Sequence, residues 1–349
     1  MVGRRVRFVR EIAPCRLHIQ LLPATRMPSH TTLARHIVRI LRQYHLSIAH
    51  ARIVANAIAD AEARGITSHG VRRLPNYIER LRAGAINPVP HLHWHTTRRG
   101  TAVLDADHAF GHVATHYAAR RLVTMTRRTG IAAVGIRRCE HMGALDTPLR
   151  TLVTANLVTL IMVNTPPAMA PMAGHTAILG SNPIAIGIPG TAQPLMIFDG
   201  ATTRVARSKV VAAATAGQTI PTDWAIDAHG NATSDPHHAL AGALLPAGTL
   251  GYGMGLSIAL LTGAMIGGVS DDHLPSFLQA PHQPVPTSVL MIGIDPDAFG
   301  GLTQLQHVGG ALVTRIRADR GQARIPGDMR HHAPIPAAAW DVIQALQSA

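Results

Sequence analysis

Four residues that can bind a small acid and exchange a proton with it lie in one short segment: Ser68, His69, Arg73 and Tyr77. If Ser68 caps a helix, the other three follow at intervals of four residues and share one helix face. An arginine fork binds a carboxylate through two hydrogen bonds, and an imidazole exchanges protons near neutral pH. The pattern is typical of a pocket for a small carboxylate. A capped surface helix with an inward-packed tyrosine would give the same pattern.

A further histidine, His141, follows the predicted strand 131–136 and precedes Gly143. A side chain at the carboxyl end of a strand is well placed to face a cleft. Its neutral imidazole could take a proton from a hydroxyl group as a hydride leaves. Because the chain has 22 histidines, an ordinary structural histidine is the alternative. The nearby Cys139 is expected to be a small buried residue and not a nucleophile.

Asp199 ends a predicted strand ahead of Gly200, Ala201 and a predicted helix over 201–216. We expect Asp199 either to cap that helix or to orient a ribose or an imidazole. A separate group of histidines, at positions 91, 93 and 95, would share one face of a strand. No carboxylate lies near these histidines in the sequence and two arginines follow them, so we predict no metal site.

The elements that must position these residues are read from the spacing of apolar residues. Helices are predicted over 31–44, 49–64, 73–82, 112–128, 201–216, 251–265, 302–318 and 336–347. Strands are predicted over 101–104, 131–136, 157–163, 183–188, 195–198 and 289–294. The glycines of segment 251–255 lack the spacing of a dinucleotide-binding loop and follow a loop, so a Rossmann unit is not predicted. The predicted fold class is mixed α/β (α+β), with helices before a sheet-rich centre.

Composition narrows the function classes. The chain has 349 residues, 47% hydrophobic and 15% charged, which excludes a disordered chain and predicts one large domain with lobes, or two domains. No run of 18 apolar residues occurs, so no membrane-spanning helix is predicted. The net charge of +13 is scattered beyond residue 26 and aromatic residues make up only 3%, so nucleic-acid binding is not predicted. The two cysteines lie far apart, as expected of a protein in the reducing cytoplasm.

Residues 1–26 differ from the rest because they hold six arginines against one glutamate. We expect a disordered extension, or a misassigned start with Met27 as the first residue. A twin-arginine signal at Arg4 and Arg5 and an amphipathic transit peptide are weaker alternatives, since the apolar stretch behind them is poor.

The segment 61–77, AEARGITSHGVRRLPNY, resembles the non-Rossmann malate/L-lactate dehydrogenase family. That family includes ureidoglycolate and sulfolactate dehydrogenases and cyclic imino-acid reductases. Further matching segments follow in the same order: 103–105, 140–143, 164–167, 179–183, 199–201, 251–253, 294–296 and 325–328. Together they cover the chain from about Met27 onward, and it is their number and order that makes the resemblance specific.

The resemblance implies a homodimer with a central mixed sheet and flanking helices. It also implies hydride transfer between NAD or NADP and a small 2-hydroxy or 2-oxo carboxylate. The implied catalytic residues are His141, His69 and Asp199, and the implied substrate-binding residues are Ser68, Arg73 and Tyr77. The implied cofactor contacts are Thr165, Asp199, Gly200, Ala201, Leu250, Pro326, Gly327 and Asp328.

The expected organisation has four parts. Residues 1–26 are the extension, and 27–100 form an N-terminal helical region with the substrate-pocket helix. Residues 101–290 form the sheet-rich cofactor-binding domain, and 291–349 form a C-terminal strand and helices that pack back on the N-terminal region.

This sequence departs from the family pattern at several positions. The family's loop lysine is Leu250, its first loop glycine is Ala247, and the usual glutamate on the next helix is Ala259. Loss of the lysine contact is expected to cost about 1.5–3 kcal/mol of cofactor binding. The usual asparagine before the catalytic histidine is Glu140, whose charge is expected to raise the pKa of His141. These departures motivate an alternative, a catalytically impaired member that acts as a binding or scaffold protein.

Overall fold

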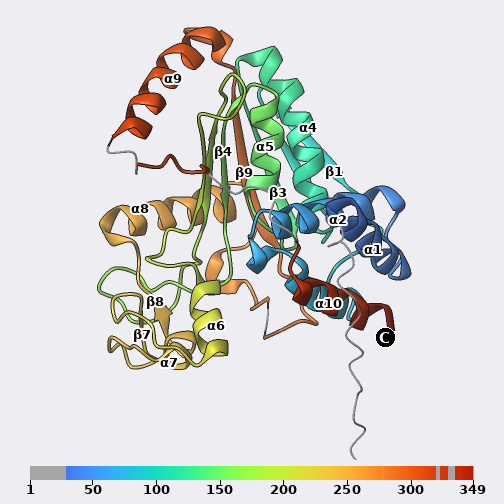
Figure 1. Ribbon diagram of the computed structural model, residues 1–349, viewed down its shortest axis with the longest axis vertical. Coiled ribbons are helices and arrows are strands. Elements are labelled where there is room, and N and C mark those ends of the chain that lie inside the picture. Colours follow the sequence, from blue (N-terminus) through green and yellow to red (C-terminus); the bar gives the residue numbers. More distant parts are fainter. Residues whose placement is uncertain (1–28, 278, 320–322, 329–334, 349) are drawn as a thin grey trace, which may run out of the picture.

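The computed structural model describes residues 29–277, 279–319, 323–328 and 335–348 (Figure 1). The predicted extension over 1–26 lies outside these residues. The helices are α1 (His30–Gln43), α2 (Ile48–Ala63), α3 (Leu74–Arg82), α4 (Gly111–Thr129), α5 (Asp146–Thr154), α6 (Arg207–Ala216), α7 (Pro236–Ala241), α8 (Gly248–Ala259), α9 (Leu302–Ala318) and α10 (Ala337–Ser348). The strands are β1 (His93–Arg98), β2 (Thr101–Asp105), β3 (Ile131–Cys139), β4 (Val158–Val163), β5 (Ile184–Ile188), β6 (Met196–Gly200), β7 (Ala225–Ile226), β8 (Ala243–Leu244) and β9 (Thr287–Ile294).

Seven strands form one mixed sheet in the order β1-β2-β3-β9-β4-β5-β6. β2 and β3 run parallel, and every other neighbouring pair in this sheet is antiparallel. The late strand β9 lies between β3 and β4, so these two strands run in the same direction and end at the same edge. The predicted mixed sheet with flanking helices is confirmed. The expected boundary at 290/291 falls inside β9, so both of the parts that it separates contribute to the sheet centre.

The alternation of side chains along the strands divides the core into two layers. Alternate residues such as Ile136, Ile161 and Met291 pack beneath α4 and α5. Their neighbours Met162 and Leu290 point to the opposite face and pack beneath α8 and the segment that follows it. Figure 1 shows α4 and α5 on one side of the sheet and α8 on the other.

A second core joins the first three helices to the end of the chain. The hydroxyl groups of Ser29 and Ser47 accept backbone N–H groups at the starts of α1 and α2, as helix capping requires. Apolar residues of α1, α2 and α3 then pack with Ile343 of α10. The C-terminal helices were expected to pack on the N-terminal region. α10 does so, whereas α9 lies at the other end of the molecule (Figure 1).

Among the described residues, no helix has the length and hydropathy needed to cross a membrane.

Candidate active site

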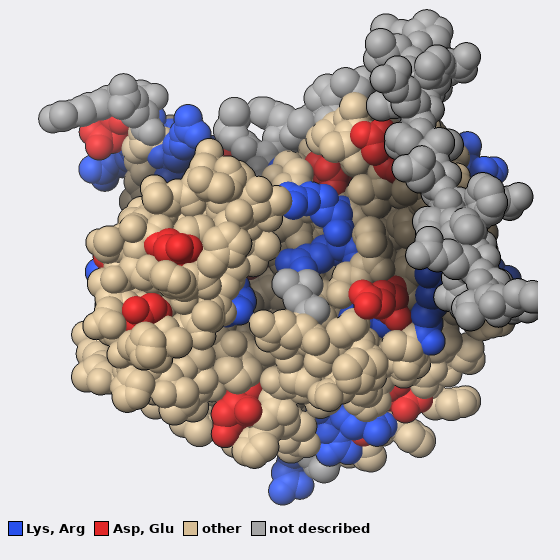
Figure 2. Space-filling view, turned by 90° about the horizontal axis from the view of Figure 1, so that it is seen from below, with Lys and Arg blue, Asp and Glu red and all other residues tan. Residues whose placement is uncertain are grey.

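Five strand ends meet at one edge of the sheet. β3, β4 and β6 end there and β5 and β9 begin there, because Cys139 pairs with Thr287 and Ile184 pairs with Gly200. The residues that follow or precede these ends, although distant in sequence, therefore surround one cleft of about 820 Å³. Figure 2 views the molecule from this side and shows Lys and Arg side chains inside the hollow.

Most residues predicted for the site line this cleft: Ser68, His69, Arg73, His141, Thr165, Asp199, Gly200, Ala201, Pro326 and Gly327. Three predicted residues are not part of its lining. Tyr77 is fully buried behind it, Leu250 is 78% exposed on the first turn of α8, and Asp328 pairs with Arg317.

The His141 imidazole is held on one nitrogen. The Tyr77 hydroxyl lies 2.7 Å from its Nδ1, and the backbone N–H of Gly143 donates to the same nitrogen at 3.3 Å. Because Nδ1 accepts the Gly143 N–H, we assign the proton of the neutral ring to Nε2. The His69 ring stacks on His141 at 5.6 Å, and the Phe277 ring lies 4.7 Å away. The nitrogen left for a substrate is therefore Nε2.

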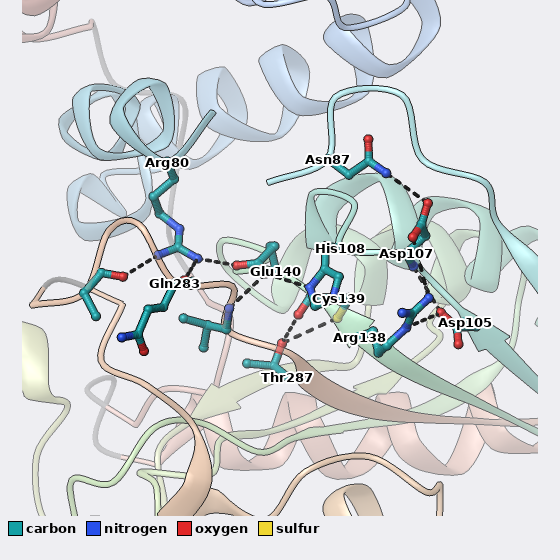
Figure 3. Close-up of polar contacts among 12 residues, drawn as sticks. Arg80, Asn87, Asp105, Asp107, His108, Arg138, Cys139, Glu140, Gln283 and Thr287 are labelled. Atoms are coloured by element: carbon teal, nitrogen blue, oxygen red, sulfur yellow. Dashed lines mark hydrogen bonds and ion pairs between the residues drawn. The ribbon is translucent and has the colours of Figure 1, made fainter. Parts of the chain in front are cut away.

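The surroundings of His141 favour its neutral form. Burial lowers its pKa well below the ordinary value, and the Arg73 cation and the rings of His69 and His112 lower it further, as does Arg80. The expectation that Glu140 raises this pKa is wrong. The Glu140 carboxylate is fully buried and turned to Arg80, whose Nη2 donates to it at 2.5 Å (Figure 3). The Arg80 cation neutralises this carboxylate, so its charge does not raise the pKa of His141.

Ser68, His69, Arg73 and Tyr77 do not share one helix, so that prediction is wrong. Two 3-10 turns, Thr67–His69 and Val71–Arg73, precede α3. The cause is a residue of α2: the buried Glu62 carboxylate accepts the N–H of Val71 at 2.8 Å, which a continuous helix would give to the carbonyl of residue 67.

These turns still bring the polar groups together. Ser68 Oγ lies 2.8 Å from His69 Nδ1, and Arg73 Nε donates to the Ser68 carbonyl at 2.7 Å. Tyr77, one turn into α3, points into the core, where burial raises the pKa of its phenol. It therefore reaches His141 from behind and does not face the cleft itself.

A buried polar network, which sequence reasoning missed, holds the Thr165 side of the cleft. The backbone N–H of Thr165 donates to Asn182 Oδ1 at 3.1 Å. Asn182 Nδ2 in turn donates to the Asp271 carboxylate at 2.7 Å, and so does the N–H of Gly180 at 2.9 Å. The sequence signal is the polar pair Ser181-Asn182 before a buried strand, but its partner Asp271 lies some ninety residues away.

At the opposite wall of the cleft two stretches of backbone approach each other closely. Ile197 in β6 donates its N–H to the Pro326 carbonyl at 3.0 Å. At Gly327, with φ +91°, a Cβ atom would lie 2.8 Å from the Ile197 carbonyl oxygen, so this close approach requires glycine. The side chains that do reach the wall are those of Asp199, Arg207 and Lys209, among others.

Of the two alternatives expected for Asp199, the one in which it caps the following helix is wrong. α6 begins at Arg207 and not at residue 201, and its N-cap Ala206 provides no side-chain bond. Burial lowers the pKa of Arg207, whose Nη2 donates to the Leu240 carbonyl.

The described residues contain no group of three histidine, cysteine or acidic side chains that could hold a metal ion. Cys139 is fully buried, and burial raises the pKa of its thiol to about 12, so it is inert at neutral pH.

Comparisons with known proteins agree with this architecture. A family model described as malate/L-lactate dehydrogenase matches residues 29–336. The chain is 31% identical over 293 residues to a malate/(S)-sulfolactate dehydrogenase of Methanothermus fervidus, covering 84% of this chain and 86% of the relative. It is 34% identical over 272 residues to a ureidoglycolate dehydrogenase (NAD(+)) of Escherichia coli, covering 78% and 77% of the two chains.

Solved structures extend the match to the fold. The crystal structure of a Δ1-piperideine-2-carboxylate reductase from Pseudomonas syringae superposes with a TM-score of 0.85 at 29% identity, over 92% of this chain and all of that one. A sulfolactate dehydrogenase from Methanocaldococcus jannaschii gives 0.83 at 29% identity, over 92% and 96%. The chain therefore belongs to the malate/L-lactate dehydrogenase family.

Proposed function

We propose that the protein is an NAD- or NADP-dependent oxidoreductase that transfers a hydride between the cofactor and a small 2-hydroxy or 2-oxo carboxylate. One observation carries this proposal. The His141 ring and the Arg73 guanidinium carbon lie 4.7 Å and 5.8 Å from the same Phe277 ring, so one small molecule can touch both. Relatives named for malate, sulfolactate and ureidoglycolate support this substrate class.

The far wall of the cleft fits a nicotinamide dinucleotide. Its backbone at Gly200, Ala201 and Gly327 leaves room for a ribose and a flat ring, and Arg207 and Lys209 offer cations for phosphates. Asp199, on the same wall, is placed to accept ribose hydroxyl groups. When bound, the nicotinamide supplies or accepts the hydride. Leu250 and Asp328 are left out of this proposal because they do not line the cleft.

Arg73 is proposed to hold the substrate carboxylate. Its Nε is already bound to the Ser68 carbonyl, so the terminal nitrogens remain for the ligand. His69, fixed by Ser68 and stacked on His141, orients the imidazole and closes the same wall. Binding a carboxylate at Arg73 also neutralises the cation that lowers the pKa of His141 most. The imidazole therefore becomes a better proton acceptor when substrate is present.

His141 is proposed to exchange the proton. To accept a proton from a hydroxyl group, Nε2 must be bare and Nδ1 must carry the ring proton. The Tyr77 phenol can accept from Nδ1–H or donate to bare Nδ1, so it supports both tautomers, whereas the 3.3 Å hydrogen bond from the Gly143 N–H is given up when Nδ1 carries the proton. In the reverse direction Nε2 returns the proton to the carbonyl oxygen as the hydride arrives.

The test is a spectrophotometric assay with NADH or NADPH and a panel of 2-oxo acids that includes pyruvate and oxaloacetate. We expect oxidation of one reduced cofactor, and a loss of at least about a hundredfold in kcat for His141→Asn. Equal rates for the two proteins would refute the role of His141. Fluorescence titration with both cofactors addresses the alternative of an impaired member, which no feature of the site favours. Cofactor binding without turnover on any acid of the panel would revive that alternative.

We further propose a homodimer in the cytoplasm. The sheet face beneath α8 is incompletely covered, since Leu160, Ile186 and Ile292 lie in one cross-strand row and remain partly exposed. α9 has no buried residue and exposes Val308, Leu312 and Ile316 on one face. Apolar surface of this extent is typical of a subunit interface. The free, buried Cys139 is in keeping with a reducing compartment.

A further inference from the structure

The residue before His141 takes part in an ion pair that the reaction itself does not use. Glu140 and Arg80 are both fully buried. Breaking such a pair costs more than it would at the surface, because one charge is left without water or partner. Tyr77 and Arg80 lie three residues apart on α3, so this helix contacts both members of the Glu140-His141 dipeptide.

Both partners also bind the segment that follows Phe277. Arg80 donates to the carbonyl of Gln283 at 3.1 Å, with longer contacts to those of Ala280 and Pro281. Glu140 Oε1 accepts the N–H of Val285 at 2.9 Å. Figure 3 shows Glu140 between Arg80 and His108, and His108 Nδ1 lies 3.3 Å from the same carboxylate. The ion pair thus joins α3, the end of β3 and the segment leading into β9.

Phe277 is the residue through which this attachment reaches the reacting groups. The centroid of its ring lies 4.7 Å from that of the His141 ring and 4.8 Å from the guanidinium carbon of Arg80. Phe277 also lines the cleft. A shift of the segment would move the wall next to the imidazole.

We propose that Arg80 and Glu140 are positioning residues, which fix His141 and Phe277 relative to each other for the hydride-transfer reaction. This inference rests on the proposed function of the cleft. It predicts that the two residues act on turnover through the placement of Phe277, and not only through the stability of the fold.

The experiment compares Glu140→Gln, Arg80→Met and the double variant, which removes both charges. Each single variant should lose thermal stability and about a hundredfold in kcat, with little change in cofactor affinity. The double variant should regain stability, because no buried charge is left alone. Its kcat should stay low, because the carbonyl groups at 280–283 still lack their donor. Phe277→Ala should lower kcat similarly and add little to the double variant.

A remote ion pair provides the control. Arg127 donates to Asp295 at 2.6 Å near the opposite end of β9, and Arg127→Met should leave kcat within about twofold of the wild type. Recovery of kcat together with stability in the double variant would reduce the pair to a structural role. An unchanged kcat in Phe277→Ala would equally overturn the inference.

Amide hydrogen exchange over residues 279–287 separates this inference from the proposed function. Exchange should be faster in both single variants and in the double variant, and unchanged in Arg127→Met. If the wild type reduces no 2-oxo acid but exchange rises as expected, the proposed function fails while the attachment stands. If the wild type is active and neither exchange nor kcat changes in the variants, the inference alone fails.

Discussion

A single phenol occupies one nitrogen of the His141 imidazole and leaves the other available. Tyr77 is fully buried, its oxygen lies 2.7 Å from His141 Nδ1, and burial raises the pKa of its hydroxyl, so it stays protonated. Tyr77→Phe keeps the buried ring but removes the partner that serves both tautomers. We expect kcat/KM to fall about ten- to a hundredfold, the value of one hydrogen bond to a group that becomes charged.

Steady-state kinetics in both directions test this expectation. The equilibrium constant of the reaction does not depend on the enzyme, so with unchanged cofactor binding kcat/KM for the acid must fall by the same factor in oxidation and reduction. A Tyr77→Phe protein with wild-type kcat/KM would show that Gly143 alone suffices to hold Nδ1.

His112 makes the stability depend on pH. It lies fully buried on the first turn of α4, and burial, with a smaller effect of His69, lowers its pKa to about 3. The unfolded chain binds a proton near pH 6.5, whereas the folded chain resists it down to about pH 3. The free energy of unfolding should therefore fall as the pH falls below 6.5, by about 1.4 kcal/mol per unit from this group. Urea unfolding between pH 7 and 5 measures the slope, and His112→Gln should make it shallower. An identical slope in the variant would contradict the assignment.

At the scale of elements, the turn after β3 connects the sheet to the imidazole. Gly143 has φ +72°, and a Cβ atom there would lie 2.5 Å from His112 Nε2. Gly143→Ala therefore combines backbone strain with a clash in the turn that carries His141. We expect a loss of about 1–3 kcal/mol in stability together with a fall in kcat.

Gly217 provides a matched control for that substitution. It ends α6 with φ +62° and has nothing within 4 Å of its Cβ position. Gly217→Ala should lower the melting temperature through backbone strain alone and leave kcat unchanged. A fall in kcat of equal size in both variants would mean that the effect of Gly143→Ala is not local to His141.

Sequence periodicity predicted the helices and strands whose bounds are set by their own residues and not by contacts with distant ones. The central strands could be found from apolar runs because one of their faces is buried and the other is apolar, and α9 was predicted with its observed bounds, Leu302–Ala318. The interruption before α3 could not be found, since it depends on Glu62 from another helix. The pKa of His141 was predicted in the wrong direction for the same reason: Glu140 is adjacent in sequence, but its partner Arg80 is sixty residues away.

At the scale of the whole molecule, the apolar surface that the folded subunit leaves exposed predicts that two subunits associate. Partly exposed apolar residues on the sheet beneath α8, and exposed ones on α8, the turn after it and α9, occupy the side of the sheet opposite to α4 and α5 (Figure 1). Burying apolar surface against a second copy lowers the free energy by about 25 cal/mol per Å², so a surface left exposed to water favours association. We therefore expect a dimer at micromolar concentration in sedimentation equilibrium.

Substitutions at exposed positions test where the interface lies without disturbing the core. Leu260 and Leu312 are 56% and 59% exposed, so Leu260→Glu with Leu312→Glu should leave the subunit folded and place two charges in the interface. The expected product is a monomer, because an interface cannot bury unpaired carboxylates. Val89, on the loop before β1, is equally exposed at 60%, and Val89→Glu should remain dimeric. A wild type that sediments as a monomer would refute the assembly, and a double variant that stays dimeric would place the interface on another face.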